Sequence, residues 1–223
     1  MNEGAQSAAR TVLLPDAPAL IAGVRVVVWL SADGEIETLD KAEAMGRLHS
    51  SQPPIICHSR SFFSRLGAKP FPVYDTLELF AFVRPAQFTL PTPRGLAEVL
   101  GLALPGSHDQ EAESLMQSAH ALISELAAAN RDRDSRAIAW AMHRGGWPWA
   151  GPVIAALGGG ESPSSTNVTS GLAVWDRLPE WDDRPLETPP SDFPVEAVEA
   201  RAQLLKLLGS GAEERPGQAQ YAG

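Results

Sequence analysis

The chain has 223 residues, a 44% hydrophobic composition and a formal net charge of −9. This length buries one core of ordinary size, and the single cysteine, Cys57, excludes an internal disulfide framework and a Cys-based zinc site. No run of about 18 apolar residues is present, and the N-terminus lacks the basic-then-apolar order of a secretory signal, so we expect a cytoplasmic chain without a membrane partner.

The acidic charge is unevenly distributed. Residues 1–150 hold 13 Lys or Arg against 16 Asp or Glu, whereas residues 151–223 hold 5 against 11. Contacts of Lys and Arg with phosphate supply most non-specific affinity for nucleic acid, so the chain alone should bind DNA or RNA weakly. A local basic strip of Arg60, Arg65 and Lys69 is the candidate nucleic-acid contact, and the alternative is an ordinary solvated helix face.

The N-terminal part predicts an antiparallel meander of three strands. Residues 11–15 suit a short strand, and residues 23–31 are β-branched and apolar, which is typical of a strand. The Ala-Asp-Gly turn at residues 32–34 and the alternation of polar and apolar residues over 35–39 then predict a hairpin.

Helices alternate with short strands after the meander. Asp40 with Glu43 three residues later forms the capping-box pattern of a helix start, and Asp75 or Thr76 caps another helix. We expect a helix over 40–50, a buried strand at 55–59 and a helical turn that ends at Gly67. A strand at 73–74 and a helix from residue 75 should follow. The last two elements of this part are a helix closed by Gly101 and a long amphipathic helix over 110–130.

This order predicts an α/β fold, a mixed sheet flanked by helices with a C-terminal helical extension. Residues 1–130 form the main domain, and residues 131–160 a helical extension around the corner Trp147-Pro148-Trp149. The corner either packs into the core or forms a stacking platform for bases. Residues 161–194 are expected to be a loop and an acidic, Pro-rich linker, and residues 195–223 a final amphipathic helix with the chain's last segment.

The order of the stretches "CHSRSFF", "YDTLEL", "RGLAEVLGL" and "HDQEAES" resembles the DEDDh family of 3′–5′ exonucleases, over roughly residues 11–128. The resemblance implies an RNase H-like fold, with an antiparallel meander extended by parallel strands. It also implies a nuclease site, in which two Mg²⁺ or Mn²⁺ ions are held by four carboxylates and a His deprotonates the attacking water.

The family's first motif is Asp-x-Glu on the first strand, and two registers are possible here. In one register, Trp29 and Ser31 take the two acidic places. In the other, Asp16 keeps the Asp and Pro18 replaces the Glu. We favour the second register because it preserves the meander, although Asp16 also suits a turn between two prolines.

The second and third motifs are partly kept. His58 keeps the end of the second-motif strand, but Phe63 stands in the Asp place, and an apolar ring cannot bind a hard cation, so we expect Phe63 in the core. His108 is followed five residues later by Glu113, as in the third motif, and the alternative is the ordinary acidic charge of a helix start. Asp16 and Glu113 are thus the remaining metal candidates and His108 the candidate base.

The stretch "EERPGQAQYA" near the C-terminus is similar to the Arg-Pro-x-Gln stretch that precedes the nucleotide-binding core of DinG-like helicases. No P-loop pattern occurs in this chain. Together the two resemblances imply a catalytically degenerate nuclease-like module at the N-terminus of an ATP-dependent DNA helicase, which would position substrate or partners. Residues 195–223 would then contain the final helix and the start of a truncated helicase domain. The module's partner would be DNA through the attached helicase, and no cofactor is expected.

Two alternatives remain open at this point. One is an active metal-dependent 3′–5′ exonuclease on DNA or RNA, which would use Asp16, His108 and Glu113 with a neighbouring acid and with Mg²⁺ or Mn²⁺. The other is a stand-alone protein-interaction domain unrelated to nucleic acid.

Overall fold

The structure is a computed structural model that describes residues 10–128, 133–159, 195–209 and 216–221. The chain divides into two compact units, Met1–Leu178 and Pro179–Gly223. The loop and linker expected over residues 161–194 lie outside the described residues.

A five-stranded mixed sheet organises the first unit, with the strand order β3-β2-β1-β4-β5. The strands are β1 (Ala19–Ala22), β2 (Val26–Leu30), β3 (Ile36–Asp40), β4 (Ile55–Ile56) and β5 (Tyr74–Asp75). The strands β1, β2 and β3 form an antiparallel meander, and β4 and β5 extend the sheet parallel to β1. The predicted α/β fold is confirmed, and this topology is consistent with an RNase H-like fold.

The position predicted for the first strand is wrong. It begins at Ala19, after Pro18, whereas residues 11–15 run outside the sheet and Thr11 N–H donates to the carbonyl of Ala155. Residues 23–31, taken as one strand in the sequence, contain the turn between two strands. Gly23 N–H donates to Val26 O at 2.9 Å, so Val24 and Arg25 form a tight hairpin turn.

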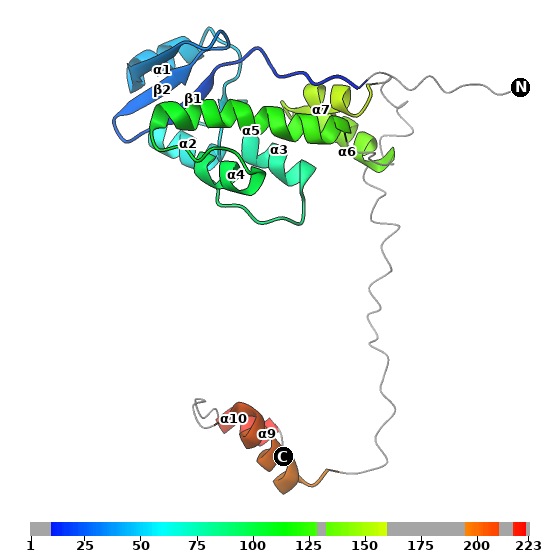
Figure 1. The fold of residues 1–223 in the computed structure, drawn as a ribbon. Coiled ribbons are helices and arrows are strands. Elements are labelled where there is room, and N and C mark those ends of the chain that lie inside the picture. Colours follow the sequence, from blue (N-terminus) through cyan, green and yellow to red (C-terminus); the bar gives the residue numbers. More distant parts are fainter. Residues whose placement is uncertain (1–9, 129–132, 160–194, 210–215, 222–223) are drawn as a thin grey trace, which may run out of the picture. The chain divides into compact units, whose positions relative to one another are not determined.

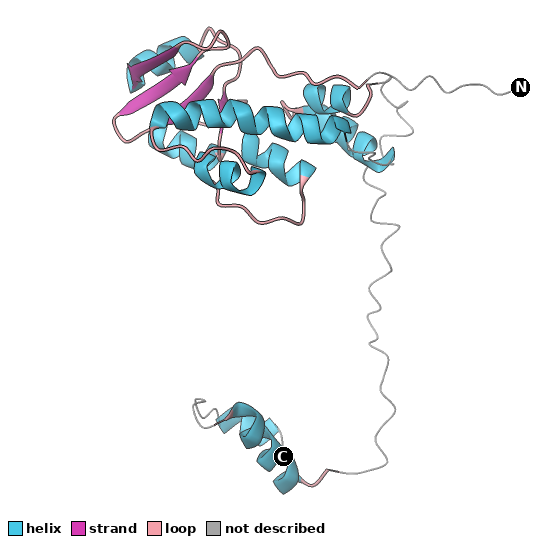
Figure 2. Cartoon of the chain, viewed as in Figure 1, coloured by secondary structure: helices cyan, strands magenta, loops and turns pink. Residues whose placement is uncertain are grey.

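Both faces of the sheet are covered, because successive side chains of a strand point to opposite sides. Toward one face, Ile21, Val28 and Ile55 pack with helices α3 (Thr76–Val83), α4 (Pro93–Leu100) and α5 (His108–Ala128). Toward the other, Leu20, Trp29 and Ile56 pack with α1 (Lys41–Leu48) and α2 (Ser59–Leu66). The result is a three-layer arrangement, in which the long helix α5 crosses the sheet (Figures 1 and 2).

Local signals placed the helix ends well. Asp40 and Glu43 form the expected capping box, with the Asp40 carboxylate 2.8 Å from two backbone nitrogens. The helices α2 and α4 end at Gly67 and Gly101, both with positive φ. These residues close their helices because glycine adopts that conformation without steric cost.

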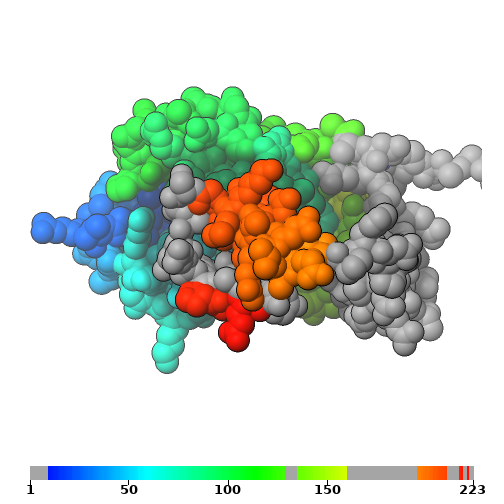
Figure 3. Space-filling model, turned by 90° about the horizontal axis from the view of Figure 1, so that it is seen from below, coloured from blue at the N-terminus to red at the C-terminus, as the bar shows by residue number. Residues whose placement is uncertain are grey.

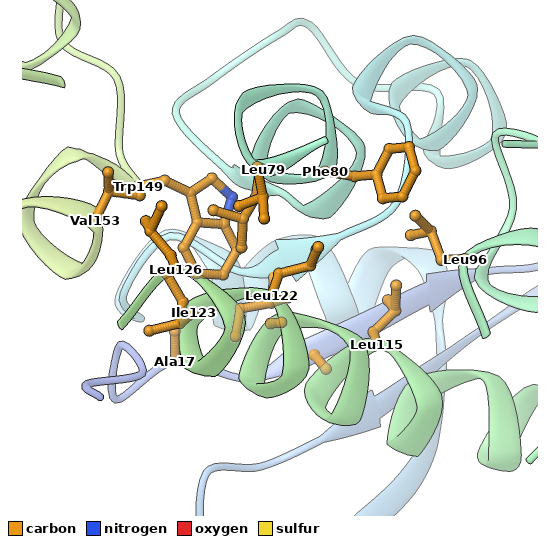
Figure 4. Packing of buried hydrophobic residues seen from close by; sticks show 14 of the residues in the cluster. Ala17, Leu79, Phe80, Leu96, Leu115, Leu122, Ile123, Leu126, Trp149 and Val153 are labelled. Carbon is orange, nitrogen blue, oxygen red and sulfur yellow. The ribbon is translucent and has the colours of Figure 1, made fainter. Parts of the chain in front are cut away.

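The helical extension contributes to the same core. It contains α6 (Arg133–Arg144) and α7 (Ala150–Ala156). Trp149 is fully buried with Leu79, Leu122 and Val153, and Figure 4 shows its indole between α3 and α5. Its Nε1–H donates to Asp75 O at 2.8 Å. The Trp-Pro-Trp corner was expected either to pack into the core or to stack on bases, and its Trp149 packs into the core.

The second unit contains α9 (Ala197–Leu208) and α10 (Pro216–Tyr221). The helix α9, orange in Figure 3, buries none of its residues, and its large apolar side chains Val198, Leu205 and Leu207 are exposed. Among the described residues, no helix has both the length and the apolar character needed to cross a membrane.

Truncating Trp149 to alanine should destabilise the first unit by about 3–5 kcal/mol, because it leaves a cavity and removes the hydrogen bond to Asp75. The matched control is Phe88→Ala, since Phe88 is 81% exposed. That change should shift the free energy of unfolding by less than about 0.5 kcal/mol. Urea unfolding measures both, and equal effects would contradict the packing described.

Candidate functional site

The carboxyl ends of the parallel strands β1, β4 and β5 meet at one end of the sheet, the usual position of ligand sites in α/β folds. Five residues with titratable side chains lie at this end of the sheet. We call them the carboxyl-end cluster: Cys57, His58, Asp75, His108 and Glu111.

Asp75 is 3% exposed, and backbone N–H groups occupy both of its carboxylate oxygens. Oδ1 accepts from His58 N–H at 2.9 Å and from Leu77 N–H at 3.0 Å, and Oδ2 accepts from Ser59 N–H at 2.6 Å. One carboxylate therefore caps the N-termini of two helices, α2 and α3. The cap on α3 was expected from the sequence, and the contact with α2 was not.

His58 joins β4 to α2 in a left-handed conformation, with φ 58° and ψ 86°. It is the only non-glycine residue with positive φ among the described residues. Such a conformation costs roughly 1–3 kcal/mol in a non-glycine residue, and the bond from its N–H to Asp75 holds it in place. Its ring Nδ1 lies 2.8 Å from Ser61 Oγ.

His108 and Glu111 are hydrogen-bonded in the first turn of α5, with Nδ1 and Oε2 separated by 2.7 Å. Their side chains are 51% and 27% exposed, so the pair is accessible to solvent. The helix start lies against the turn that follows β1. A Cβ added to Gly23 would be 3.5 Å from His108 Nε2 and 3.0 Å from Val26 O, so this position favours glycine.

Cys57 is a neutral thiol at physiological pH. Burial raises its pKa, and the negative charges of Asp75 and Glu111 raise it further. Because the thiolate is the reactive form, Cys57 is not an activated nucleophile.

The structure does not bring the predicted metal candidates Asp16 and Glu113 together. Asp16 is exposed and precedes β1, next to Ala17, which lies beside Ile123 in Figure 4. Ile123 is near the C-terminal end of α5, whereas Glu113 is exposed near the N-terminal end of the same helix. Ten residues of helix separate positions 113 and 123, which is roughly 15 Å.

Neither register proposed for the first motif matches the observed first strand. The strand β1 consists of Ala19–Ala22, so it carries no carboxylate. Trp29 lies on β2, where it is buried beneath the Arg47 guanidinium, and Ser31 follows β2. Pro18 precedes β1. The preference for Asp16 and Pro18 depended on a strand over residues 11–15, which the structure does not contain.

Phe63 lies in the core, as predicted. It is 7% exposed and packs edge-to-face against Phe71, with ring centroids 4.9 Å apart. The second-motif position is therefore part of the packing between α2 and the sheet. Within residues 10–128, 133–159, 195–209 and 216–221, no group of three or more His, Cys, Asp or Glu is arranged to hold a metal ion.

The candidate nucleic-acid residues Arg60, Arg65 and Lys69 are exposed on and after α2. Arg65 Nη1 donates to Ala22 O at 3.4 Å, which places this guanidinium at the carboxyl end of β1. Sequence reasoning assigned the metal role to Glu113 and treated Asp109 and Glu111 as ordinary acidic charge of the helix start. The spacing of three residues between His108 and Glu111 is a signal for a paired side chain on a helix.

No family model matches the chain, and no match was found among the curated proteins or the solved structures.

Removing the Asp75 carboxylate should destabilise the first unit strongly. In Asp75→Ala, three N–H groups lose a charged acceptor, two of them at the start of α2, so we expect a loss of about 3 kcal/mol or more. Asp40→Ala is the matched control, because Asp40 is an exposed cap with two such contacts and should cost about 0.5–2 kcal/mol. Thermal or urea unfolding compares them, and the double capping role is refuted by equal losses.

Proposed function

We propose that this chain is a catalytically degenerate nuclease-like module of an ATP-dependent DNA helicase, which positions nucleic acid beside the motor. The observation that carries the proposal is the combination of an RNase H-like strand order with a carboxyl end that holds His108 but lacks a set of free carboxylates. The resemblance in the order of the sequence motifs supports the same ancestry.

Hydrolysis by two metal ions requires converging carboxylates that clamp the attacking water and the phosphate. Here β1 offers only apolar side chains, both oxygens of Asp75 accept backbone hydrogen bonds, and Phe63 fills the second-motif position. Of the acids near His108, Glu111 contacts its ring, and Asp109 is exposed at the helix start. A role in holding substrate therefore agrees better with these residues than turnover does.

Nucleic acid would contact exposed basic residues of α2. Arg60 and Arg65 lie there, and Arg65 reaches the same strand end as His108. The chain's net charge of −9 opposes binding elsewhere, so the affinity of the isolated chain should be low and strongly dependent on salt.

The link to a helicase rests on the Arg-Pro-x-Gln resemblance, whose proline begins α10. It has a direct test that is independent of the nuclease-like site. The reading frame should continue past Gly223 into a P-loop, Gly-x-x-x-x-Gly-Lys followed by Ser or Thr. A reading frame that stops at Gly223 would remove the helicase from the proposal.

The full chain should bind a fluorescein-labelled single-stranded 20-mer with a Kd of about 10⁻⁴–10⁻⁶ M, weakening steeply between 50 and 200 mM salt. Arg60→Glu should weaken binding about fivefold, since it replaces a phosphate contact with a repulsive charge. Arg94→Glu, on α4, is the matched control and should change the Kd less than about twofold. Anisotropy measures both, and equal effects would place the contact elsewhere.

Digestion of the same oligonucleotide with 1 mM Mn²⁺ should give no product above background, because each missing contact to a metal or oxyanion costs several kcal/mol in the transition state. The proposal of a degenerate site is overturned if product forms and His108→Ala abolishes it.

A further inference from the structure

The strand β3 forms one edge of the sheet, because β2 is its single neighbour in the strand order. In an antiparallel pair, positions that exchange hydrogen bonds with the neighbouring strand alternate with positions that do not. Ser31 N–H donates to Glu35 O at 2.8 Å, so the bonded positions on β3 are the odd-numbered ones. The N–H and C=O groups of Ile36 and Thr38 therefore point away from β2.

The end of the strand supports this direction. Asp40 is the next even position, and its N–H donates to Glu43 Oε2 at 3.1 Å, not to its register partner on β2. Residues 36–38 are all exposed, so no element in the described part of the chain covers the edge here. The edge thus offers two backbone donors and two acceptors to an added strand.

The side chains of β3 differ between its two faces. Ile36 and Thr38 lie on the face of α5, since their register partners on β2 belong to the core beneath that helix. Ile36 and the nearby Val26 remain 36% and 38% exposed. Glu35 and Glu37 point to the opposite face, because side chains alternate along a strand. An added strand would therefore meet apolar groups on one face and carboxylates on the other.

The edge carries excess negative charge. Residues 33–43 contain one cation, Lys41, and five acids: Asp33, Glu35, Glu37, Asp40 and Glu43. Arg47 pairs with Glu37 at 2.7 Å, and Arg25 lies in the neighbouring hairpin turn, so five negative charges meet three positive ones. Asp33 and Glu35 are exposed, and neither takes part in a salt bridge within the described residues. The uncompensated charge is therefore at the start of β3.

We propose that β3 binds a basic, extended segment of another protein as an additional strand, with cationic side chains beside Asp33 and Glu35 and a β-branched side chain beside Ile36. Backbone hydrogen bonds supply the affinity, and the alternation of side chains supplies the specificity. The proposal is independent of the proposed nuclease-like function.

Charge favours this occupant over the alternatives. If β3 paired with β3 of a second copy, with Ile36 opposite Thr38, the two Glu37 side chains would face each other, and like charges in opposite positions destabilise a sheet. Nucleic acid would bring its phosphates to an edge with excess carboxylates, which is also unfavourable. A basic strand meets neither penalty.

The test uses the full chain and a fluorescein-labelled nine-residue peptide in which Lys alternates with Val or Thr. We expect a Kd of about 10⁻⁵ M, the micromolar range of a small interface. Replacing every Lys by Glu should weaken binding at least tenfold, and separating the same residues into two blocks should weaken it at least fivefold. Absence of an anisotropy change up to 1 mM peptide, or equal binding of the three peptides, overturns the proposal.

Methylation of peptide nitrogens tests for strand pairing. Alternate N–H groups of an added strand point toward β3 and away from it. N-methylation of one alternate set should therefore abolish binding, whereas methylation of the other should change the Kd less than about threefold. Equal effects of the two sets would show a contact through charge alone and would contradict the proposal.

Protein variants locate the site. Thr38→Pro removes an outward N–H without removing a bond to β2, and proline is tolerated in edge strands, so this variant should fold and lose at least tenfold in affinity. Its control, Thr38→Ala, keeps the N–H and should lose less than twofold. Glu35→Lys should weaken binding about fivefold, and Glu98→Lys, an exposed reversal on α4, less than twofold. Equal losses within either pair overturn the assignment, as does a dimer in sedimentation that Thr38→Pro dissociates.

Discussion

The buried carboxylate of Asp75 is the contact on which the rest of the first unit depends. It ends β5, caps α3, and binds the two N–H groups that begin α2. Its own carbonyl accepts the indole N–H of the buried Trp149. The elements β5, α3 and α2 and the residue before α7 thus meet at Asp75. A carboxylate buried to this degree is tolerated only when hydrogen bonds replace its water, and these three N–H groups do so.

The same contacts explain why the carboxyl end of the sheet has little free chemistry. Asp75 is engaged, Phe63 is in the core, and the Cys57 thiol is kept neutral by burial and by nearby negative charge. The exposed pair of His108 and Glu111 remains. Stability and a two-metal site would compete for the same positions, and here the packing contacts occupy them. This competition is the physical basis for proposing that the module holds nucleic acid and does not cleave it.

Local chemistry made much of the fold predictable, because capping boxes and left-handed glycines depend on few neighbouring residues, as at Asp40, Gly67 and Gly101. The first strand was missed because the two central residues of its turn, Val24 and Arg25, are not Gly, Asn or Asp and have no positive φ, which leaves Gly23 as the only turn signal there. The choice of Asp16 as a metal candidate was affected as well, since it depended on a first strand over residues 11–15. The double cap by Asp75 requires β4 and β5 to be neighbours, which no local pattern reveals.

The most direct test of the central claim is Mn²⁺-induced broadening of amide signals in an NMR spectrum of the full chain. If backbone N–H groups occupy the Asp75 carboxylate and no metal centre exists at this end of the sheet, the amides of His58, Ser59, Leu77 and Glu111 should broaden no more than exposed amides elsewhere at 1 mM Mn²⁺. Selective broadening of these four amides at micromolar Mn²⁺ would contradict the account, because it would show a metal site formed by the carboxylates described here as engaged.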